Sequence, residues 1–408
     1  GKNSRMYQAL VYDRPLAVSV DVSVENHSLT SMFSVDVTLQ PGASVEEVNA
    51  IIDRELKTFR KEGPTAEELQ RAQTKINAQT VRGLEQIGGF GGKAVTLAQG
   101  QLYAGDPAFF LTRLGWINEA SPDAVRAVAQ EWLGEGRYQL DVLPYGEYQT
   151  VASTVDRSKG LPPVGDMPEL SFPAVQRAEL DNGLTVVLAE RSTVPVVNFA
   201  LQFDAGYAAD ALGTLGASSF TLAMMDEGTK DRSALEISAE AEALGANIST
   251  SSNLDMSAVT MSALKTNLGP SLDLYADIIK EPAFAEDEIE RLRPRWLANI
   301  QQEKNQPVGI ALRNLPPLIY GEDHAYGIPL TGSGTEESIA SLTRDDLVDF
   351  HQTWIRPSNG TLFVVGDTTM DEILPMLNKR FGKWKENRKA VPQKNLADVA
   401  LADEAQVF

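Results

Sequence analysis

Few side chains in this chain of 408 residues are suited to covalent or metal chemistry. The sequence has no cysteine, which excludes a disulfide, a thiolate metal site and a cysteine nucleophile. Its three histidines are His27, His324 and His351, and none has a second histidine or a glutamate at the spacing of metal ligands on a helix. No Gly-x-Ser-x-Gly segment marks a serine nucleophile. These patterns favour structural roles for His324 and His351 and a surface loop for His27.

Two other features resemble sites at first sight. Asp226 and Glu227 are both acidic, but adjacent residues of a helix point in different directions. They therefore predict an exposed acidic helix end and not an acid–base pair. The glycine-rich segment at residues 88–92 lacks the Lys-Ser/Thr of a phosphate-binding loop, so a connector is the better interpretation.

The stretch Gly216–Thr229, GASSFTLAMMDEGT, is by itself an ordinary apolar helix segment suited to a core. It also resembles the zinc-binding helix of the pitrilysin, insulin-degrading-enzyme and mitochondrial-processing-peptidase family. In that family a helix carries His-x-x-Glu-His, whose histidines bind zinc and whose glutamate activates the bound water. The frame of the family motif is present here as Gly216, Phe220, Met224, Gly228 and Thr229.

The family's zinc-binding and catalytic residues are missing from the matching positions. Ser219 stands at the first histidine, Leu222 at the glutamate and Ala223 at the second histidine. The family's later glutamate ligand is matched by Asn299, 76 residues after Ala223 (299 − 223). Leucine and alanine have no donor atom, and a serine alone is a poor zinc ligand. The resemblance therefore implies a degenerate site, with no catalytic residue and no metal ligand in this chain.

Strand and helix patterns alternate in the first part of the chain. Residues 17–24 and 32–39 alternate like half-buried strands, and two long helices follow, capped by Ser44 and Thr65. Glu47, three residues after Ser44, predicts a capping box. Residues 4–12 form a helical pattern before these strands, and the order helix, strand, strand, helix, helix indicates α+β structure.

A similar unit follows after residue 174. Asn182-Gly183 between two β-rich runs predicts a hairpin, and a helix is expected to end at Gly245 before two further strands. Helices are expected over residues 213–225, 267–281, 286–305 and 307–320, and a last strand and helix within residues 360–384.

The predicted fold class is α+β, with two related domains, each a mostly antiparallel sheet packed against long helices, as in pitrilysin-type metallopeptidases. Residues 1–145 are expected to be the C-terminal-type domain of a first half that begins upstream of Gly1. Residues 146–174 are expected to be a linker, because they are rich in Pro, Gly, Ser and Thr. Residues 175–385 would be the pseudo-catalytic domain of a second half, and residues 386–408 the start of a further domain.

Charge narrows the choice of partners. With 56 acidic and 36 basic residues, the formal net charge of −20 argues against nucleic acid or an anionic membrane surface as a partner. No segment approaches the roughly 20 apolar residues of a membrane span. The composition resembles that of a bacterial protein, and family habit suggests the periplasm, with the cytoplasm as the alternative.

The resemblance implies a non-catalytic part of a zinc-dependent peptidase. Such a part forms chamber wall and a surface that binds unfolded peptide, while zinc and hydrolysis belong to an active domain or partner outside this chain. Two alternatives remain open: a separate inactive subunit that pairs with an active peptidase, and a purely structural scaffold of the same fold.

Overall fold

The computed structural model describes residues 1–26, 30–88, 91–134, 136–142, 174–386 and 390–400. The linker predicted at residues 146–174 lies outside this part except for its last residue, as do His27 and the end of the predicted segment 386–408. Among the described helices, none combines the length and the apolar character needed to cross a bilayer.

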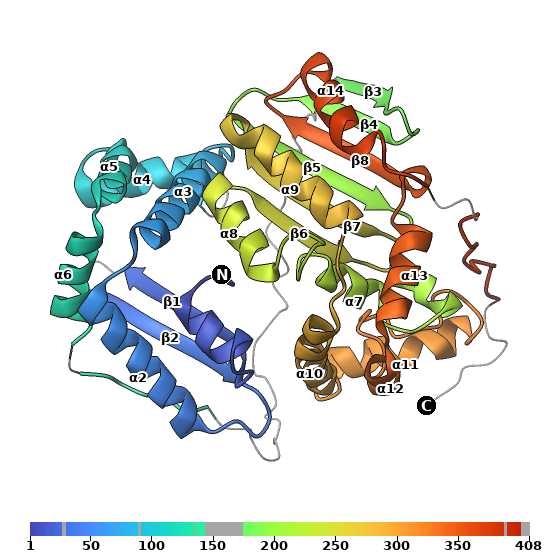
Figure 1. Ribbon diagram of the computed structural model, residues 1–408, viewed down its shortest axis with the longest axis horizontal. Coiled ribbons are helices and arrows are strands. Elements are labelled where there is room, and N and C mark those ends of the chain that lie inside the picture. The colour runs from blue at the N-terminus through green and yellow to red at the C-terminus, as the bar shows by residue number, and fades with distance from the viewer. Residues whose placement is uncertain (27–29, 89–90, 135, 143–173, 387–389, 401–408) are drawn as a thin grey trace, which may run out of the picture.

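The first block of the chain is a hairpin covered by helices (Figure 1). Its elements are α1 (Arg5–Tyr7), the π-helical turn η1 (Gln8–Tyr12), β1 (Ala17–Asn26), β2 (Ser31–Leu39), α2 (Val45–Glu62), α3 (Ala66–Gly83), α4 (Lys93–Ala104), α5 (Phe109–Glu119) and α6 (Pro122–Trp132). The strands β1 and β2 pair antiparallel, with Val22 opposite Val35. Apolar residues of η1, β1 and α2 form a small core that includes Leu10, Ala17 and Ile51.

Hydrogen bonds from side chains fix where α2 and α3 begin. At α3 the predicted cap is a complete capping box, in which Thr65 and Glu68 each bond the other's backbone N–H. At α2 only half of the predicted box forms. Ser44 accepts a hydrogen bond from the backbone N–H of Glu47 at 3.2 Å, but the Glu47 carboxylate contacts the guanidinium of Arg14.

The second block contains a six-stranded sheet. Its strands are β3 (Val175–Glu179), β4 (Thr185–Glu190), β5 (Val196–Phe203), β6 (Asn247–Ser252), β7 (Ser257–Leu264) and β8 (Gly360–Gly366). They lie in the order β3-β4-β8-β5-β7-β6, and among these described pairs only β4 and β8 run parallel. The predicted mostly antiparallel α+β architecture is confirmed.

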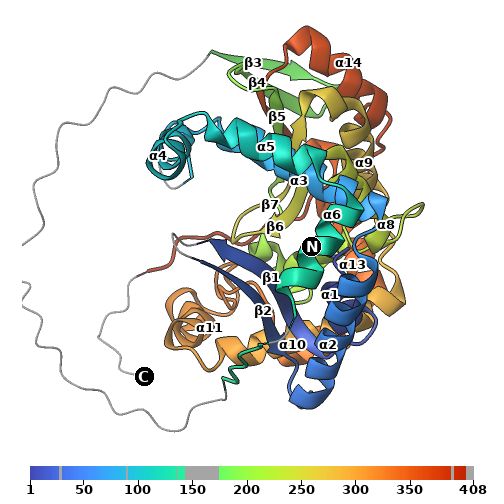
Figure 2. The same ribbon diagram turned by 90° about the vertical axis from the view of Figure 1, so that its left-hand side faces the viewer.

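The helices of the second block leave one face of this sheet open. They are the 3-10 turn η2 (Tyr207–Leu212), α7 (Ala217–Met224), α8 (Ala234–Leu244), α9 (Leu268–Lys280), α10 (Glu286–Glu303), α11 (Pro307–Tyr320), α12 (Glu336–Ser341), α13 (Arg344–Trp354) and α14 (Met370–Phe381). Figure 2 shows α9 and α14 on one side of the sheet, whereas α4 and α11 stand out on the other side. A large apolar core forms beneath α9 and α14 and includes Leu201, Tyr275 and Phe381. The bounds of the four predicted segments, 1–145, 146–174, 175–385 and 386–408, remain predictions.

Candidate functional site

The start of α7 is fixed by close packing at a glycine. Gly216 has φ of +88°, a conformation that disfavours any residue with a Cβ atom. A Cβ atom at this position would also lie 2.8 Å from Cδ1 of Ile339 and 3.0 Å from Cα of Gly334. Both the backbone conformation and the neighbouring loop therefore require glycine here, whether or not the helix binds a metal.

The other end of the motif is held by hydrogen bonds. Gly228 has φ of +145°, and the hydroxyl of Thr229 donates to Oδ2 of Asp277 on α9 at 2.7 Å. Arg232 donates to the same oxygen atom at 2.7 Å. The Gly-Thr part of the frame thus joins α7 to α9, which is a structural role.

The four predicted positions lie on two helices. Ser219, Leu222 and Ala223 are on α7 and Asn299 is on α10. Leu222 is 1% exposed and belongs to the apolar core, Ser219 and Ala223 are half-buried, and Asn299 is exposed.

Aromatic rings connect these two helices. The ring centroids of Phe220 and Trp296 lie 5.1 Å apart in an edge-to-face arrangement. The indole N–H of Trp296 donates to the backbone oxygen of Ser333 at 2.9 Å. Asn299 follows Trp296 by three residues on α10, so it lies about one helical turn beyond this contact.

These residues do not fit a zinc ion. A leucine in the core and an alanine offer no ligand, and a serine hydroxyl and an amide are not the imidazole, thiolate or carboxylate groups that zinc prefers. Across the described part of the chain, no three His, Cys, Asp or Glu side chains gather in a way that could hold a metal ion. The assignment of Ser219, Leu222, Ala223 and Asn299 to ligand positions remains a prediction.

Two histidines have structural partners. Nδ1 of His324 accepts a hydrogen bond from the backbone N–H of Tyr326 at 3.0 Å, and its ring stacks on Tyr320 with centroids 5.1 Å apart. His351 is buried with Nε2 2.8 Å from the backbone oxygen of Ile279, and burial lowers its pKa. These contacts agree with the structural roles that the sequence favoured.

The expectation of an exposed acidic helix end is wrong for Glu227. This residue is 7% exposed, and its carboxylate lies 3.0 Å from Nζ of Lys2 and 2.6 Å from Nη2 of Arg291. Arg291 in turn bonds Glu288 at 2.6 Å and lies over the ring of Tyr12. The cluster connects the beginning of the chain to α10.

The charges of this cluster stabilise one another. Lys2 also contacts Asp226 at 3.0 Å. Burial by itself would lower the pKa of Lys2, but the carboxylates of Asp226 and Glu227 outweigh this effect and raise the pKa above its usual value. We infer a structural role, because both charges of each pair are satisfied within the cluster.

A buried carboxylate supports the first turn of α7. Asp210 is 3% exposed and accepts hydrogen bonds from the backbone N–H groups of Gly216 and Ser218 at 2.9 Å each. Burial raises the pKa of Asp210 to about 7 despite these bonds. No pattern in the sequence indicated this role, since Asp210 lies outside the motif.

The open face of the sheet is a surface that the helices of this block leave uncovered. Along β7, and along β5 from Val197 onward, buried and half-buried residues alternate, so that every second side chain faces outward. The register places the outward side chains in three rows across four strands: Ser251–Ala258–Gln202–Thr361, Ser249–Thr260–Ala200–Phe363 and Asn247–Ser262–Asn198–Val365. Most of them are small or polar, and none is charged.

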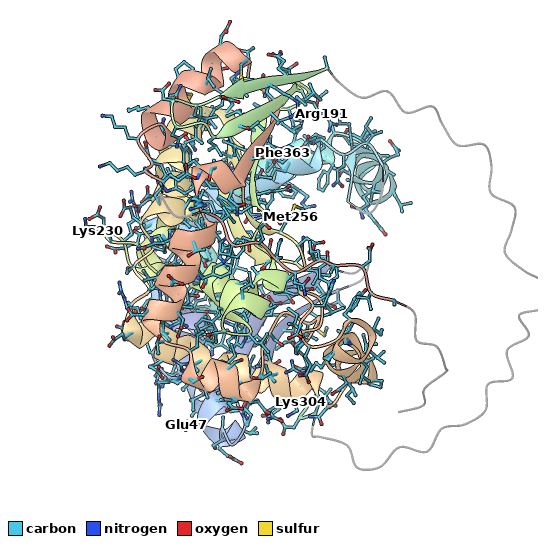
Figure 3. All side chains as sticks on the ribbon, turned by 90° about the vertical axis from the view of Figure 1, so that its right-hand side faces the viewer. Glu47, Arg191, Lys230, Met256, Lys304 and Phe363 are labelled. Carbon is cyan, nitrogen blue, oxygen red and sulfur yellow. The ribbon has the colours of Figure 1, made fainter. Side chains whose placement is uncertain are left out.

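An apolar helix face lies beside this surface. Val308, Leu312, Leu315 and Ile319 follow a helical repeat along α11 and are each 40% to 70% exposed. Figure 3 shows Phe363 and Met256 toward the side of the molecule on which α11 and α4 stand. Neutral polar rows and a neighbouring apolar stripe can contact a peptide backbone and apolar side chains, respectively.

Two family models match the chain. The model of the insulinase family, peptidase family M16, matches residues 185–331, and the model of the peptidase M16 inactive domain matches residues 1–76 and 341–406. Together these matches cover more than half of the chain.

Two curated proteins are similar in sequence to about half of this chain. Mitochondrial-processing peptidase subunit beta of Rattus norvegicus is 28% identical over 218 residues, which are 52% of this chain and 43% of that protein. Cytochrome b-c1 complex subunit 1 of Bos taurus is 26% identical over 213 residues, again 52% of this chain and 43% of that protein. The chain thus spans less than half the length of these relatives.

Solved structures share the fold. A peptidase M16 inactive domain from Pseudomonas fluorescens matches with a TM-score of 0.50 and 24% identity, covering 54% of each chain. A protease from Helicobacter pylori matches with a TM-score of 0.51 and 23% identity, covering 55% of this chain and 54% of that one.

Proposed function

Because this chain belongs to the insulinase family of peptidases, peptidase family M16, we propose that it is a non-catalytic part of a zinc-dependent peptidase. The open face of its six-stranded sheet forms part of a chamber wall and binds substrate peptide in an extended, unfolded form. Hydrolysis belongs to an active domain outside this chain, where a zinc ion would activate the water molecule that attacks the peptide bond.

The observation that supports peptide binding is the chemistry of the open face. Asn198, Gln202, Ser249 and Thr260 each carry a group that donates and accepts hydrogen bonds. Such groups match the backbone of a peptide and not a particular side chain. No side chain of the three rows is charged, although Arg82 of α3 donates to the hydroxyl of Ser262 in the third row at 2.9 Å. The desolvation penalty of binding is therefore lowest over the other two rows. A surface of this kind suits substrates of varied sequence.

Peptide binding can be tested with the purified chain and a fluorescein-labelled, uncharged, unstructured peptide of about 15 residues. We expect saturable binding by fluorescence anisotropy and no cleavage of the peptide by mass spectrometry. Ser249→Arg places a long side chain in the middle row, and we expect it to weaken binding at least about tenfold, or about 1.4 kcal/mol.

Ser341→Arg is the matched control, because Ser341 is exposed at the end of α12, away from the open face. It should leave the affinity unchanged. An equal loss in both variants, or no binding by the unmodified chain, would contradict peptide binding at the open face.

A scaffold without substrate is the second candidate, and the similarity to cytochrome b-c1 complex subunit 1 favours it. A separate inactive subunit that pairs with an active peptidase is the third. Stable complex formation with a zinc-binding peptidase, which then cleaves the labelled peptide, would support the separate subunit. Complex formation without cleavage or peptide binding would support the scaffold.

For the location we propose the periplasm, from family habit, with the cytoplasm as the alternative. Fractionation of a bacterial source with periplasmic and cytoplasmic markers tests it. Recovery with the cytoplasmic marker would overturn the assignment.

A further inference from the structure

The segment at residues 390–400 has no helix or strand, yet it is held against the second block by its backbone. The backbone oxygen of Asn395 accepts a hydrogen bond from the N–H of Ala325 at 2.9 Å. The side-chain amide of Asn395 donates to the backbone oxygen of Asp323 at 2.8 Å. An extended peptide is thus already bound to this surface, and it belongs to the chain itself.

Lys394 inserts its side chain into an acidic environment. The side chain is 7% exposed, although the residue lies in a segment on the surface. Its ammonium group forms an ion pair with the carboxylate of Asp204 and lies 3.5 Å from the backbone oxygen of Asp255. Since Asp204 follows β5 directly and Asp255 lies in the turn between β6 and β7, the ammonium group sits at the end of the open face.

Aromatic residues build the neighbouring wall. The hydroxyl of Tyr326 donates to Oδ1 of Asp255 at 2.7 Å, and this bond raises the pKa of Tyr326 to about 12. The rings of Tyr320, His324 and Tyr326 lie against one another with centroids 5.1 to 5.6 Å apart. These contacts fix Asp255 and keep the wall rigid.

We propose that Asp204, the backbone of Asp255 and the backbone of Asp323–Ala325 form a subsite for a lysine side chain of an extended peptide, which Lys394 occupies in the free chain. The proposal rests on the proposed function, because the subsite continues the row Ser251–Ala258–Gln202–Thr361 beyond the end of β5. A substrate lysine would replace Lys394, and the segment 390–400 therefore limits access to the subsite.

Lysine suits this subsite better than other side chains. Its apolar stem can be buried while a compact ammonium group reaches one carboxylate and one carbonyl oxygen. The bond from the N–H of Ala325 to the backbone oxygen of Asn395 shows that the flanking backbone is bound as well, and the Asn395 side chain adds a bond to Asp323. The lysine is therefore recognised within a chain and not as a free amine. The net charge of −20 also favours basic peptides.

The test removes the ammonium group of Lys394 from the subsite and then adds the lysine-containing segment as a separate peptide. Lys394→Met in the full chain keeps the stem and removes the charge. The probe is a fluorescein-labelled peptide with the sequence of residues 391–400, VPQKNLADVA, beside the same peptide with norleucine in place of lysine. We expect the lysine peptide to bind Lys394→Met at least about tenfold more tightly than it binds the unmodified chain.

Two comparisons establish specificity. The norleucine peptide should bind Lys394→Met about tenfold more weakly than the lysine peptide does, and Asp204→Asn combined with Lys394→Met should abolish this difference. Lys379→Met, which removes an exposed lysine of α14, is the matched control and should behave like the unmodified chain. Equal thermal midpoints of all variants would show that each has folded.

Equal affinity of the lysine peptide for Lys394→Met and the unmodified chain would overturn the subsite, as would equal binding of the two peptides to Lys394→Met. If the uncharged 15-residue peptide still binds the open face in those cases, only the subsite is wrong. If neither kind of peptide binds any variant, the proposed function is wrong as well.

Discussion

Asp210 accepts two hydrogen bonds from Ser218, one from the backbone N–H at 2.9 Å and one from the hydroxyl at 3.0 Å. The carboxylate thereby satisfies backbone donors at the start of α7, a task that a residue directly before a helix usually performs. Because Asp210 is buried, its replacement should lower the free energy of unfolding. Asp210→Asn turns an amide N–H₂ toward backbone donors, and we expect a loss of about 1–3 kcal/mol in the free energy of unfolding, measured with denaturant.

The protonation of Asp210 should make part of the stability dependent on pH. Its pKa is raised from 3.8 to about 7 in the folded chain, so between about pH 4 and pH 7 the folded state retains a proton that the unfolded state releases. The contribution of this group to the free energy of unfolding therefore falls as the pH rises through that window and stays constant above it. The difference in stability between the unmodified chain and Asp210→Asn, measured at pH 5 and pH 7.5, should be smaller at pH 7.5. A difference that grows with pH would contradict the raised pKa.

Gly216→Ala tests whether packing alone preserves the frame of the motif. The added methyl group would meet Ile339 and Gly334, and φ of +88° adds backbone strain. We expect a loss of about 2–4 kcal/mol in the free energy of unfolding. Gly42→Ala is the control, since Gly42 has φ of +83° but nothing within 4 Å of the added atom, and it should lose only about 1 kcal/mol. Equal losses would mean that the neighbouring loop gives way.

Three substitutions should restore a metal site if the predicted ligand positions are right. Ser219→His and Ala223→His place two imidazoles one helical turn apart, and Asn299→Glu supplies a carboxylate from α10. We expect the triple variant to retain about one zinc ion per chain by elemental analysis, and the unmodified chain far less than one.

The matched control has amides at the same three positions, with Ser219→Asn, Ala223→Asn and Asn299→Gln, and should bind no zinc. Similar zinc content in both variants would show that the assignment of the ligand positions is wrong. The triple variant keeps Leu222, because a glutamate there would bury a charge in the core.

The ion pairs of Glu227 should contribute more to stability than those on the surface. Glu227→Ala leaves Lys2 with Asp226 alone and Arg291 with Glu288 alone, both partly buried, and we expect a loss of about 1–3 kcal/mol in the free energy of unfolding. Glu290→Ala removes a carboxylate that pairs with Arg293 but is 67% exposed, and it should lose less than about 0.5 kcal/mol. Thermal or denaturant unfolding of both variants decides the point, and comparable losses would contradict a structural role for the buried cluster.

Short sequence patterns were sufficient to predict many turns and helix ends of the second block. Asn182-Gly183 produced the expected hairpin, with Gly183 at φ of +83°, and α8 ends where Gly245 adopts φ of +63°. Such signals lie within a few residues, so one segment of sequence contains all that is needed. The helices α4, α5 and α6 were not expected. On α4 and α5, exposed apolar residues such as Leu102 and Trp116 break the simple amphipathic pattern.

Contacts between distant residues could not be predicted. Glu227 is buried because Lys2 and Arg291, 225 and 64 residues away, meet at one place. The open face depends in the same way on the order of the strands, in which β8 inserts between β4 and β5. Alternation within β5 predicts that one side is buried, but only the arrangement of the helices decides which side is left open. For the candidate site, the sequence supplied the positions on α7 and α10 but not Asp210 or the subsite around Lys394.

The contact of Gly216 with Ile339 and Gly334 has a consequence for the history of such chains. Gly216 packs against Gly334 and against Ile339 of α12, and neither residue matches a zinc-ligand position, so selection for a folded chain would keep α7 in place even in a chain that had lost its zinc ligands. Loss and regain of activity would then require only exchanges of a few side chains, with no rebuilding of the backbone. A motif search that relied on residues such as Gly216, Gly228 and Thr229 would consequently find chains with and without zinc ligands.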